Sequence, residues 1–269
     1  MFGNPLASQL QGPGGAPPST LDGITAQMIN QILGSGKYPG LSMKSFYGER
    51  LYDTARVAAG TALPTSEFQL FSNPFGSQQT EINGTTQYTK TLIDTNMTNA
   101  RQLPAGQYAW ITSIQVRCTL TGQLDDSTQT GANLGLANAP GTGSAAVAGD
   151  DVIGVNLIQA ALESFIIKFN YAGTDFERGP LFLFPSRYGV SGVAGGFMYV
   201  PTTAGTGIGQ NEAIFNNGFG GVYTLPCVRQ IDSLYQFAVA LQAFNNFVPT
   251  RNFRIQVILE GLGAKSVVG

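Results

Sequence analysis

The sequence contains no histidine. Histidine is the most frequent general base in enzymes and the most frequent metal ligand in proteins. Its absence excludes Ser–His–Asp and Cys–His catalysis within this chain. We therefore expect no catalytic residue, no cofactor and no metal site, and we predict that the protein is not an enzyme.

Charged residues are scarce: they make up 11% of the chain, and 14 basic residues against 16 acidic ones leave a net charge of −2. An ordinary soluble domain has about 25% charged residues. Because charge is depleted at the cores of interfaces, this composition favours a protein whose surface is largely covered by neighbours. A secreted or low-charge globular domain is the alternative. The basic residues form no cluster, so we expect no specific nucleic-acid partner.

The two cysteines, Cys118 and Cys227, are not spaced as a CxxC motif. Cys118 falls in a strongly patterned strand, so we expect it to be a buried thiol and both cysteines to be reduced. The chain starts without the basic and apolar regions of a signal peptide. No apolar run reaches the roughly 20 residues of a membrane span. We expect the protein to be made in a cytoplasm.

Glycine-rich motifs in the chain do not meet the requirements of phosphate binding. The segment 34–37, Gly-Ser-Gly-Lys, resembles the end of a P-loop, but Gln31 stands where a glycine is needed and Tyr38 where Ser or Thr is needed. Residues 141–146 match only the loosest dinucleotide fingerprint, without a strand before them or a helix after them. We interpret both as ordinary glycine-rich segments, and Asn83-Gly84 as a turn between strands.

Two stretches, 121–150 and 185–211, are rich in glycine and lack apolar periodicity. Loops of this length are usually functional or disordered. The pairs Asp125-Asp126 and Asp150-Asp151 flank the first stretch. Adjacent carboxylates can bind Ca²⁺, but these match no calcium loop. We interpret them as solvated loop residues.

The first 40 residues differ from the rest. Residues 1–20 are rich in Gly, Pro, Gln and Ser, which predicts an extended arm rather than a helix or strand. Residues 20–33 carry apolar side chains at helical spacing and predict a short amphipathic helix. Such a helix packs on its own domain, on a neighbouring subunit or on an internal membrane. We favour the neighbouring subunit, because an isolated helix of this length is marginal in water and the region has almost no positive charge.

From residue 41 to 269 the chain predicts an all-β sandwich, because many strand patterns follow one another with little helix between them. A short helix is expected within 152–162. The clearest predicted strands are 108–120, 164–171, 181–184, 231–244 and 253–260; weaker ones are 44–51, 66–72, 87–94, 196–200 and 213–224.

Alternation within the strands predicts which side chains form the core. Residues 108–120 alternate between apolar and polar side chains over a dozen positions. Ser113, Gln115 and Arg254 are expected on the solvent face and should tolerate substitution unless they lie at a subunit contact. The predicted core-facing set is Trp110, Ile114, Val116, Phe237, Val239, Ile255 and Val257.

The order and style of these strands resemble the jelly-roll major capsid proteins of tailless icosahedral bacteriophages. The segments that carry the resemblance are 94–97, 103–107, 222–226, 230–234 and 254–262. The resemblance implies a jelly-roll sandwich, either single or a compact double one. It also implies a coat subunit in a virion that assembles with copies of itself into trimers or capsomers and then a shell. Other virion proteins, and an internal membrane reached through the N-terminal helix, are further implied partners.

Two other classes compete with a coat subunit. One is a phage spike or carbohydrate-binding β-sandwich, for which Tyr188, Phe197 and Tyr199 could supply exposed aromatic side chains. The other is a β-sandwich enzyme, but cupin metal sites need histidine and no acid–base constellation is evident in the sequence.

Overall fold

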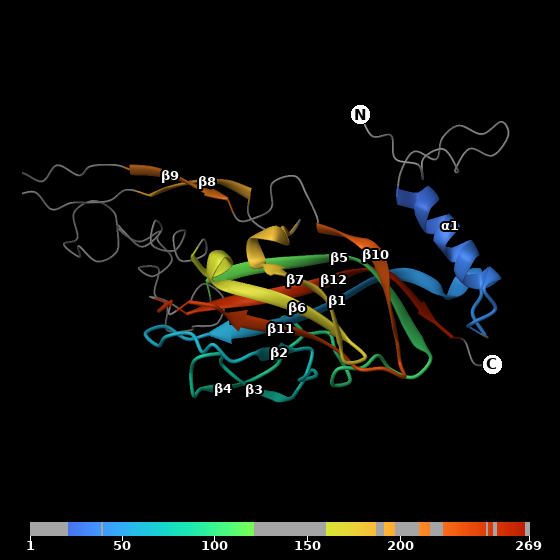
Figure 1. Ribbon diagram of the computed structural model, residues 1–269, viewed down its shortest axis with the longest axis horizontal. Helices are drawn as coiled ribbons and strands as arrows, with labels where there is room; N and C mark the ends of the chain where they lie inside the picture. Colours follow the sequence, from blue (N-terminus) through green and yellow to red (C-terminus); the bar gives the residue numbers. More distant parts are fainter. Residues whose placement is uncertain are drawn as a thin grey trace, which may run out of the picture.

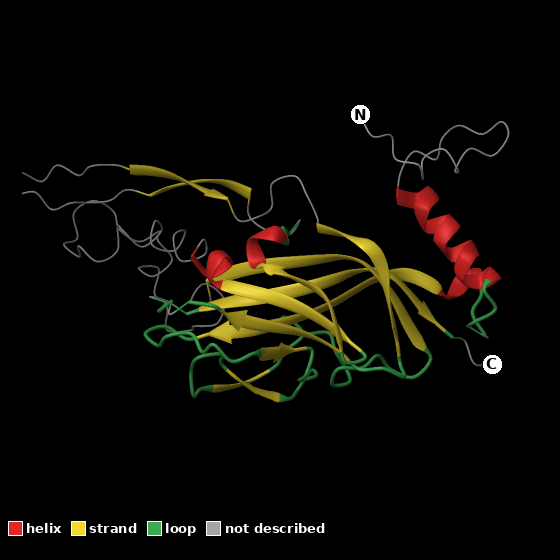
Figure 2. Ribbon diagram, viewed as in Figure 1, coloured by secondary structure: helices red, strands yellow, loops and turns green. Residues whose placement is uncertain are grey.

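A computed structural model describes residues 21–38, 40–120, 160–186, 191–196, 210–215, 223–245, 247–249 and 252–266. Most of these residues lie in antiparallel β-sheets, with few helices (Figures 1 and 2). The predicted all-β class is therefore confirmed. The predicted arm, residues 1–20, and the glycine-rich stretch 121–150 with its Asp pairs lie outside the described residues.

Two four-stranded sheets form the body of the molecule, and every ladder in them is antiparallel. The first sheet has the spatial order β1 (Phe46–Val57), β12 (Phe253–Lys265), β5 (Gln107–Leu120), β10 (Tyr223–Asp232). The second has the order β2 (Phe68–Leu70), β11 (Phe237–Ala243), β6 (Phe165–Tyr171), β7 (Thr174–Pro180).

Smaller elements complete the described structure. The pairs β3 (Gln78–Thr80) with β4 (Gln87–Thr89), and β8 (Ser191–Gly196) with β9 (Gln210–Phe215), form two-stranded ribbons. Helix α1 (Leu21–Gly34) matches the predicted N-terminal helix within one residue at each end. Two 3-10 turns, η1 (Met43–Ser45) and η4 (Leu181–Leu183), and a helical turn at 160–164 are the other helical segments described.

The sheets pack face to face around one continuous core. Buried apolar side chains from both sheets belong to a single cluster, which also includes residues outside the strands such as Leu63, Met97 and Leu103. Because alternate residues of each strand point into this layer, the core follows from the period-two pattern of the sequence. The inward-facing set includes Leu51, Ala55, Val57, Leu70, Ile111, Ile114, Val116, Cys118, Phe165, Ile167, Phe169, Phe237, Val239, Leu241, Phe253, Ile255, Val257 and Leu259.

Trp110 was predicted to face the main core, but it lies on the outer face of the first sheet. The ladder between β5 and β12 shifts register at Glu260/Gly261, where Ser113 and Ile111 are successive partners and Thr112 is the extra residue. A β-bulge of this kind reverses the alternation on one side of the insertion. As a result Ile111 and Ile114 both face the main core, whereas Trp110 faces outward and joins a second apolar cluster.

The predicted strand 231–244 is two strands in different sheets. Asp232 ends β10, and its Oδ1 accepts a hydrogen bond from the Leu234 N–H at 2.8 Å. This side chain-to-backbone turn interrupts the extended backbone, which crosses to the second sheet and resumes at Phe237. The apolar pattern of 231–244 continues across this turn, so the pattern alone does not show where one strand ends and the next begins.

The predicted strand 181–184 is also wrong. Leu181 and Phe184 are buried and Phe182 and Leu183 are exposed, as expected for the 3-10 turn η4, in which every third residue shares a face. The predicted loop 185–211 includes β8, so that prediction is wrong in part. Of the weaker strand predictions, 44–51, 66–72, 87–94 and 213–224 each overlap an observed strand, while most of 196–200 lies outside the described residues.

The three side chains predicted to face solvent are buried. Ser113, Gln115 and Arg254 each expose 6% or less of their surface. Gln115 donates a hydrogen bond to Glu260 Oε2, and Arg254 lies near the buried carboxylate of Asp94. The outer face of the first sheet therefore carries a polar layer of its own, and the expected tolerance of these positions is not supported.

Candidate functional site

Helix α1 packs on the outer face of the first sheet of its own chain. Ile32 is buried against Trp110, Leu262 and Ala264, and Met28 and Ile29 lie beside them. The β5–β12 bulge creates this site, because it turns Trp110 toward the helix. In Figure 1 the helix stands at one end of the sandwich, near the start of β1 and the end of β12.

Aromatic rings from the segment after the helix secure the contact. The Tyr38 ring meets the rings of Tyr108 and Trp110 edge to face, with centroids 5.1 and 5.4 Å apart. Phe46 lies 6.0 Å from Trp110. Edge-to-face pairs of this kind add about 0.5–1.5 kcal/mol each beyond burial. The helix thus has a partner within its own chain, whereas the sequence favoured a neighbouring subunit.

A groove of about 520 Å³ runs between α1 and the edge of the first sheet. The apolar residues that line it are Met28, Ile32, Trp110 and Val228. Its size falls within the range of ligand-binding clefts. The polar lining residues are Gln27, Gln31, Ser35, Lys37, Tyr38 and Gln230.

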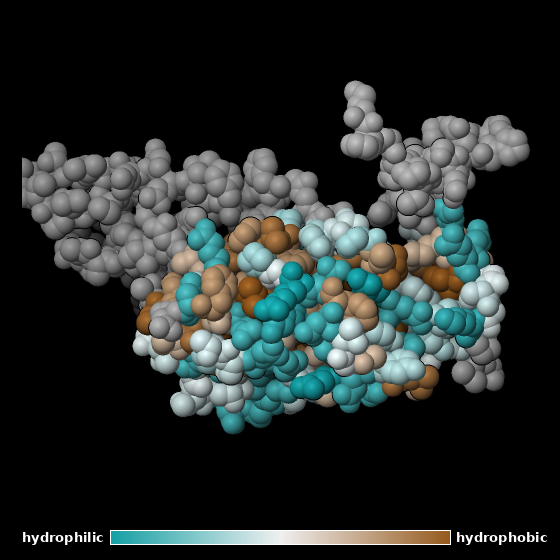
Figure 3. All heavy atoms as spheres, in the orientation of Figure 1, coloured by the Kyte–Doolittle hydropathy of each residue, from teal (hydrophilic) through white to brown (hydrophobic). Residues whose placement is uncertain are grey.

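Several large apolar side chains are exposed on the described surface. Leu92 and Ile93 form one pair, 64% and 67% exposed, and Leu234 is 79% exposed beside Tyr235. Single exposed apolar residues are ordinary, but adjacent ones on rigid turns suit protein contacts. Figure 3 shows apolar surface beside α1 and around η4. Further exposed members are Met43, Phe75, Phe182, Leu183, Phe244 and Val248.

Hydrogen bonds from neighbouring side chains fix the backbone of the Leu92–Ile93 pair. The Tyr52 hydroxyl donates to the Leu92 carbonyl at 2.5 Å, and the Gln256 amide donates to the Ile93 carbonyl at 3.2 Å. The Asp94 carboxylate accepts hydrogen bonds from the backbone and hydroxyl of Thr91. The two aliphatic side chains are therefore presented to solvent on a fixed turn.

A row of aromatic rings bridges the two sheets at the side formed by β7 and β10. The Tyr171 ring lies 6.4 Å from Phe176 and 5.9 Å from Tyr235. The Arg229 guanidinium lies over the Phe176 ring, 4.7 Å from its centroid, and pairs with Glu177 at 3.2 Å. An ion pair and a cation–π contact thus link the edge strands of the two sheets.

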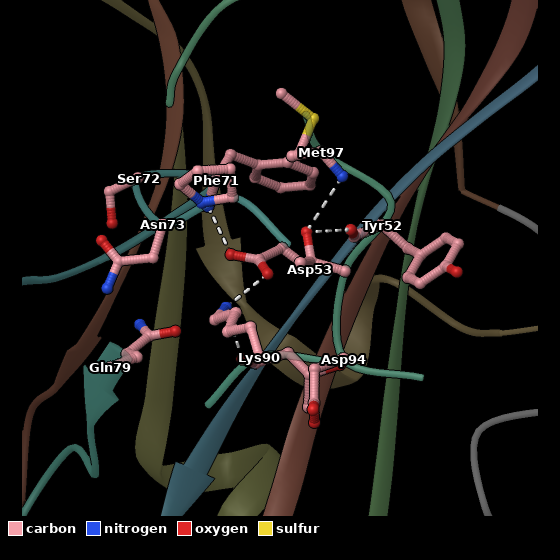
Figure 4. Close-up of polar contacts among 12 residues, drawn as sticks. Tyr52, Asp53, Phe71, Ser72, Asn73, Gln79, Lys90, Asp94 and Met97 are labelled. Carbon is pink, nitrogen blue, oxygen red and sulfur yellow. Dashed lines mark hydrogen bonds and ion pairs between the residues drawn. The ribbon is translucent and has the colours of Figure 1, made fainter. Parts of the chain in front are cut away.

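At the opposite side, between β1 and β2, lies a fully buried ion pair. The Lys90 ammonium contacts Asp53 Oδ1 and donates to the Thr54 carbonyl at 2.9 Å. The other carboxylate oxygen of Asp53 accepts the Phe71 N–H at 2.6 Å. Figure 4 shows the Asp53 carboxylate between the Phe71 nitrogen and the Lys90 ammonium.

Burial controls the titration of this pair. Removal from water raises the pKa of the Asp53 carboxyl, against the opposing effects of Lys90 and the Phe71 N–H. The same cause lowers the pKa of the Lys90 ammonium, against the attraction of Asp53. Both shifts favour the neutral forms. The free-energy difference between the ion pair and a neutral carboxylic acid beside a neutral amine is therefore smaller here than it would be in water.

A second buried carboxylate, Asp94, lies close to two arginines of the outer face. Its Oδ1 is 3.6 Å from Arg56 Nη2 and 3.9 Å from Arg254 Nη1. Burial lowers the pKa of Arg254, with the positive charge of Arg56 acting in the same direction and Asp94 against it. The arginines come from neighbouring strands, since Arg56 and Arg254 are register partners in the β1–β12 ladder.

The residues singled out in the sequence do not converge. Gly34–Lys37 end α1 and lead away from it, without the strand that a P-loop requires. Asn83 lies between β3 and β4, as predicted for a turn, and its side chain hydrogen-bonds the backbone of Ala58 and Thr61. Cys118 is buried and Cys227 exposed, and the two do not form a disulfide. Tyr188, Phe197 and Tyr199 lie outside the described residues.

Among the described residues, no group of three or more Cys, Asp or Glu side chains is arranged to hold a metal ion. Within the same part of the chain, no helix is long and apolar enough to cross a membrane. The Asp53–Lys90 pair was missed in the sequence because neither residue belongs to a motif. The only local signal is an Asp at an inward-facing position of β1, between Leu51 and Ala55.

The chain matches no family model, and neither the curated proteins nor the solved structures give a match.

Proposed function

We propose that the two sheets form a single jelly roll. Numbered in chain order, the eight strands of the two sheets pair as first with eighth, second with seventh, third with sixth and fourth with fifth. A jelly roll is what results when one long hairpin with this nested pairing is rolled into two sheets. The remaining ladders, β12 with β5 and β11 with β6, join the rolled halves within each sheet.

We further propose that the protein is the major coat subunit of a virion, assembling with copies of itself into an icosahedral shell. The nested strand order carries the proposal, because viral capsid proteins are one of the main users of this architecture. Lectin domains and cupins also use this architecture. A lectin function would require a sugar-binding site, and a cupin function would require a metal site. Scarce charge and adjacent exposed apolar side chains favour a surface made for other subunits.

The same surfaces suggest how copies would meet. The Leu92–Ile93 pair and the Leu234–Tyr235 turn are apolar protrusions, and the groove beside α1 is lined by apolar side chains together with amide groups. The proline-rich leader, residues 1–20, has the composition that aromatic-lined grooves bind in extended form. We favour a neighbouring copy over an internal membrane as its partner, since residues 1–36 contain neither Lys nor Arg.

Light scattering after gel filtration, followed by negative-stain microscopy, tests the proposal. A coat subunit should appear as trimers, capsomers or closed shells rather than monomers. Deleting residues 1–20 should leave a folded sandwich with α1 in place but impair assembly. A protein that stays monomeric at all concentrations and salt conditions would contradict the proposal.

Point variants sharpen this test. Leu234→Asp and Ile93→Asp each place a charge on an exposed apolar protrusion, so we expect assembly to weaken while the melting temperature stays unchanged. Thr61→Asp adds the same charge at an exposed polar position and serves as the control. Equal assembly of all three variants would exclude these protrusions from the subunit contacts.

The second candidate is a glycan-binding spike or module, and the aromatic row favours it. Tyr235 and Phe176 are exposed beside Tyr171, with Asn170, Asp175 and Asp232 near them on the same strands and turn. Flat rings next to amide and carboxylate groups are suited to binding sugars. Glycan-array binding that Tyr235→Ala abolishes, by a protein that remains monomeric, would support this function over the coat.

A further inference from the structure

We propose that Lys90 and Asp53 become joined covalently, through an amide bond between the Lys90 Nζ and the Asp53 side-chain carbonyl carbon. Such an isopeptide would tie β1 to the segment after β4. The inference goes beyond the proposed function and does not depend on it.

Burial is the first argument. The side chains of Lys90 and Asp53 are both fully inaccessible to solvent, and the ammonium contacts the carboxylate directly. Amide formation releases water, and bulk water favours the reverse reaction. A site without access to solvent removes this opposition. Holding the two groups together also replaces a bimolecular encounter, and effective molarities of roughly 10⁵–10⁸ M are known for well-oriented groups.

The surroundings of Asp53 fit an electrophile. Its Oδ2 accepts the Phe71 N–H at 2.6 Å, while Oδ1 faces Lys90. A backbone N–H aimed at one oxygen stabilises the negative charge that develops there when an amine attacks the carbon. Phe71 is fixed in this orientation by a left-handed backbone, φ 63°, and by its buried ring against Phe237. The donor is therefore preorganised.

The surroundings of Lys90 fit a nucleophile. An amine must lose a proton before it attacks, and burial favours the neutral forms of both Lys90 and Asp53. One proton passing from Nζ to Oδ1 provides a neutral amine and a carboxylic acid in contact. The Thr54 carbonyl accepts a hydrogen bond from Nζ at 2.9 Å, which orients the amine.

The reaction balances without any co-reactant. Nζ forms a bond to Cγ of the protonated Asp53, and the oxygen held by Phe71 carries the transient negative charge. A second proton moves from Nζ to the hydroxyl oxygen, the bond from Cγ to that oxygen breaks, and one water leaves. Nothing is oxidised or reduced, and the product is a secondary amide.

The chain contains an internal control. Lys168 also contacts a carboxylate directly, that of Glu67, but the Glu67 side chain is 41% exposed. Ion-pair contact is the same in both cases, whereas burial differs. We expect the amide only at the buried pair.

Intact mass under denaturing conditions tests the proposal. The expected mass of the purified full-length chain is lower by one water than that of its Lys90→Met variant after correction for the substitution. Proteolysis should release one branched peptide that links Lys90 to Asp53, and none that links Lys168 to Glu67. A mass equal to that of the linear sequence, in freshly purified and in aged protein, would overturn the proposal.

Asp53→Asn provides a second, independent measurement. An asparagine at this position would form the same amide by loss of ammonia, so the reacted variant should have the same mass as the reacted natural chain. Lys90→Arg retains the positive charge but offers no primary amine, and it should keep its full linear mass. An Asp53→Asn chain at its linear mass, with the natural chain also unreacted, would show that the pair is purely ionic.

Discussion

The carbonyl oxygen of Trp110 lies 2.0 Å from the position that a Cβ atom would occupy on Gly261. The close approach lies at the bulge, where Gly261 is the partner of Ile111 and Thr112 is the extra residue of β5. Because the neighbour is backbone and not a flexible side chain, the two strands would have to separate to accept any larger residue. Gly261 therefore permits the bulge that turns Trp110 toward α1.

Gly261→Ala should destabilise the protein by about 1–3 kcal/mol or more, as expected for overpacking at a rigid site. Chemical denaturation measures the change. Gly48→Ala is the matched control in the adjacent strand, since no atom lies within 4 Å of a Cβ placed there. Equal stability of the two variants would mean that the bulge relaxes without cost.

Ile32→Ala should release α1 without unfolding the sheets. Ile32 belongs to the outer cluster with Trp110, which is separate from the main core. We expect hydrogen exchange to accelerate across 25–34 while the main unfolding transition changes little. Phe237→Ala, inside the main core, should instead cost about 3–5 kcal/mol of global stability. Similar global losses for both variants would show that helix and sandwich unfold as one unit.

Arg254→Ala should lower the free energy of unfolding by about 3 kcal/mol, because it removes one partner of the buried Asp94 carboxylate. This value is near the lower end for a buried ion pair, since Arg56 still faces Asp94 in the variant. Arg50→Ala removes an exposed pair with Glu260 and should cost about 0–1 kcal/mol. Urea denaturation of both variants makes the comparison. A negligible effect of Arg254→Ala on the free energy of unfolding would support the prediction from the sequence that this position tolerates substitution.

Cys118 should make the protein less stable in alkali. Complete burial raises the pKa of its thiol from the ordinary value of 9.0 to about 12. Above pH 9 the unfolded chain loses this proton while the folded chain keeps it, so the free energy of unfolding falls as pH rises toward 12. The slope contributed by the thiol approaches about 1.4 kcal/mol per pH unit.

The difference in unfolding free energy between the natural chain and Cys118→Ala, measured from pH 8 to 11, isolates this contribution. Thiol labelling provides a second readout: exposed Cys227 should react in the native state, and Cys118 only after unfolding. Rapid labelling of both cysteines in native protein would contradict the burial of Cys118.

The sequence by itself determined the β class, the helix at 21–34 and most inward-facing positions. Alternation and helical spacing are local properties, so Val116, Val239 and Ile255 could be placed in the core without knowing which strands pair. The absence of histidine and the scarcity of charge likewise restrict function before any fold is known.

Only the tertiary structure decided where Trp110 points, where the strand 231–244 breaks and how Asp53 meets Lys90. A bulge depends on the partner strand, since Thr112 is extra only relative to Glu260 and Gly261. The buried pair joins residues 37 positions apart, and neither has a local pattern that marks the other. Periodicity reports the burial of each residue along one strand, whereas register and long-range contacts are set by the energy of the assembled sheets.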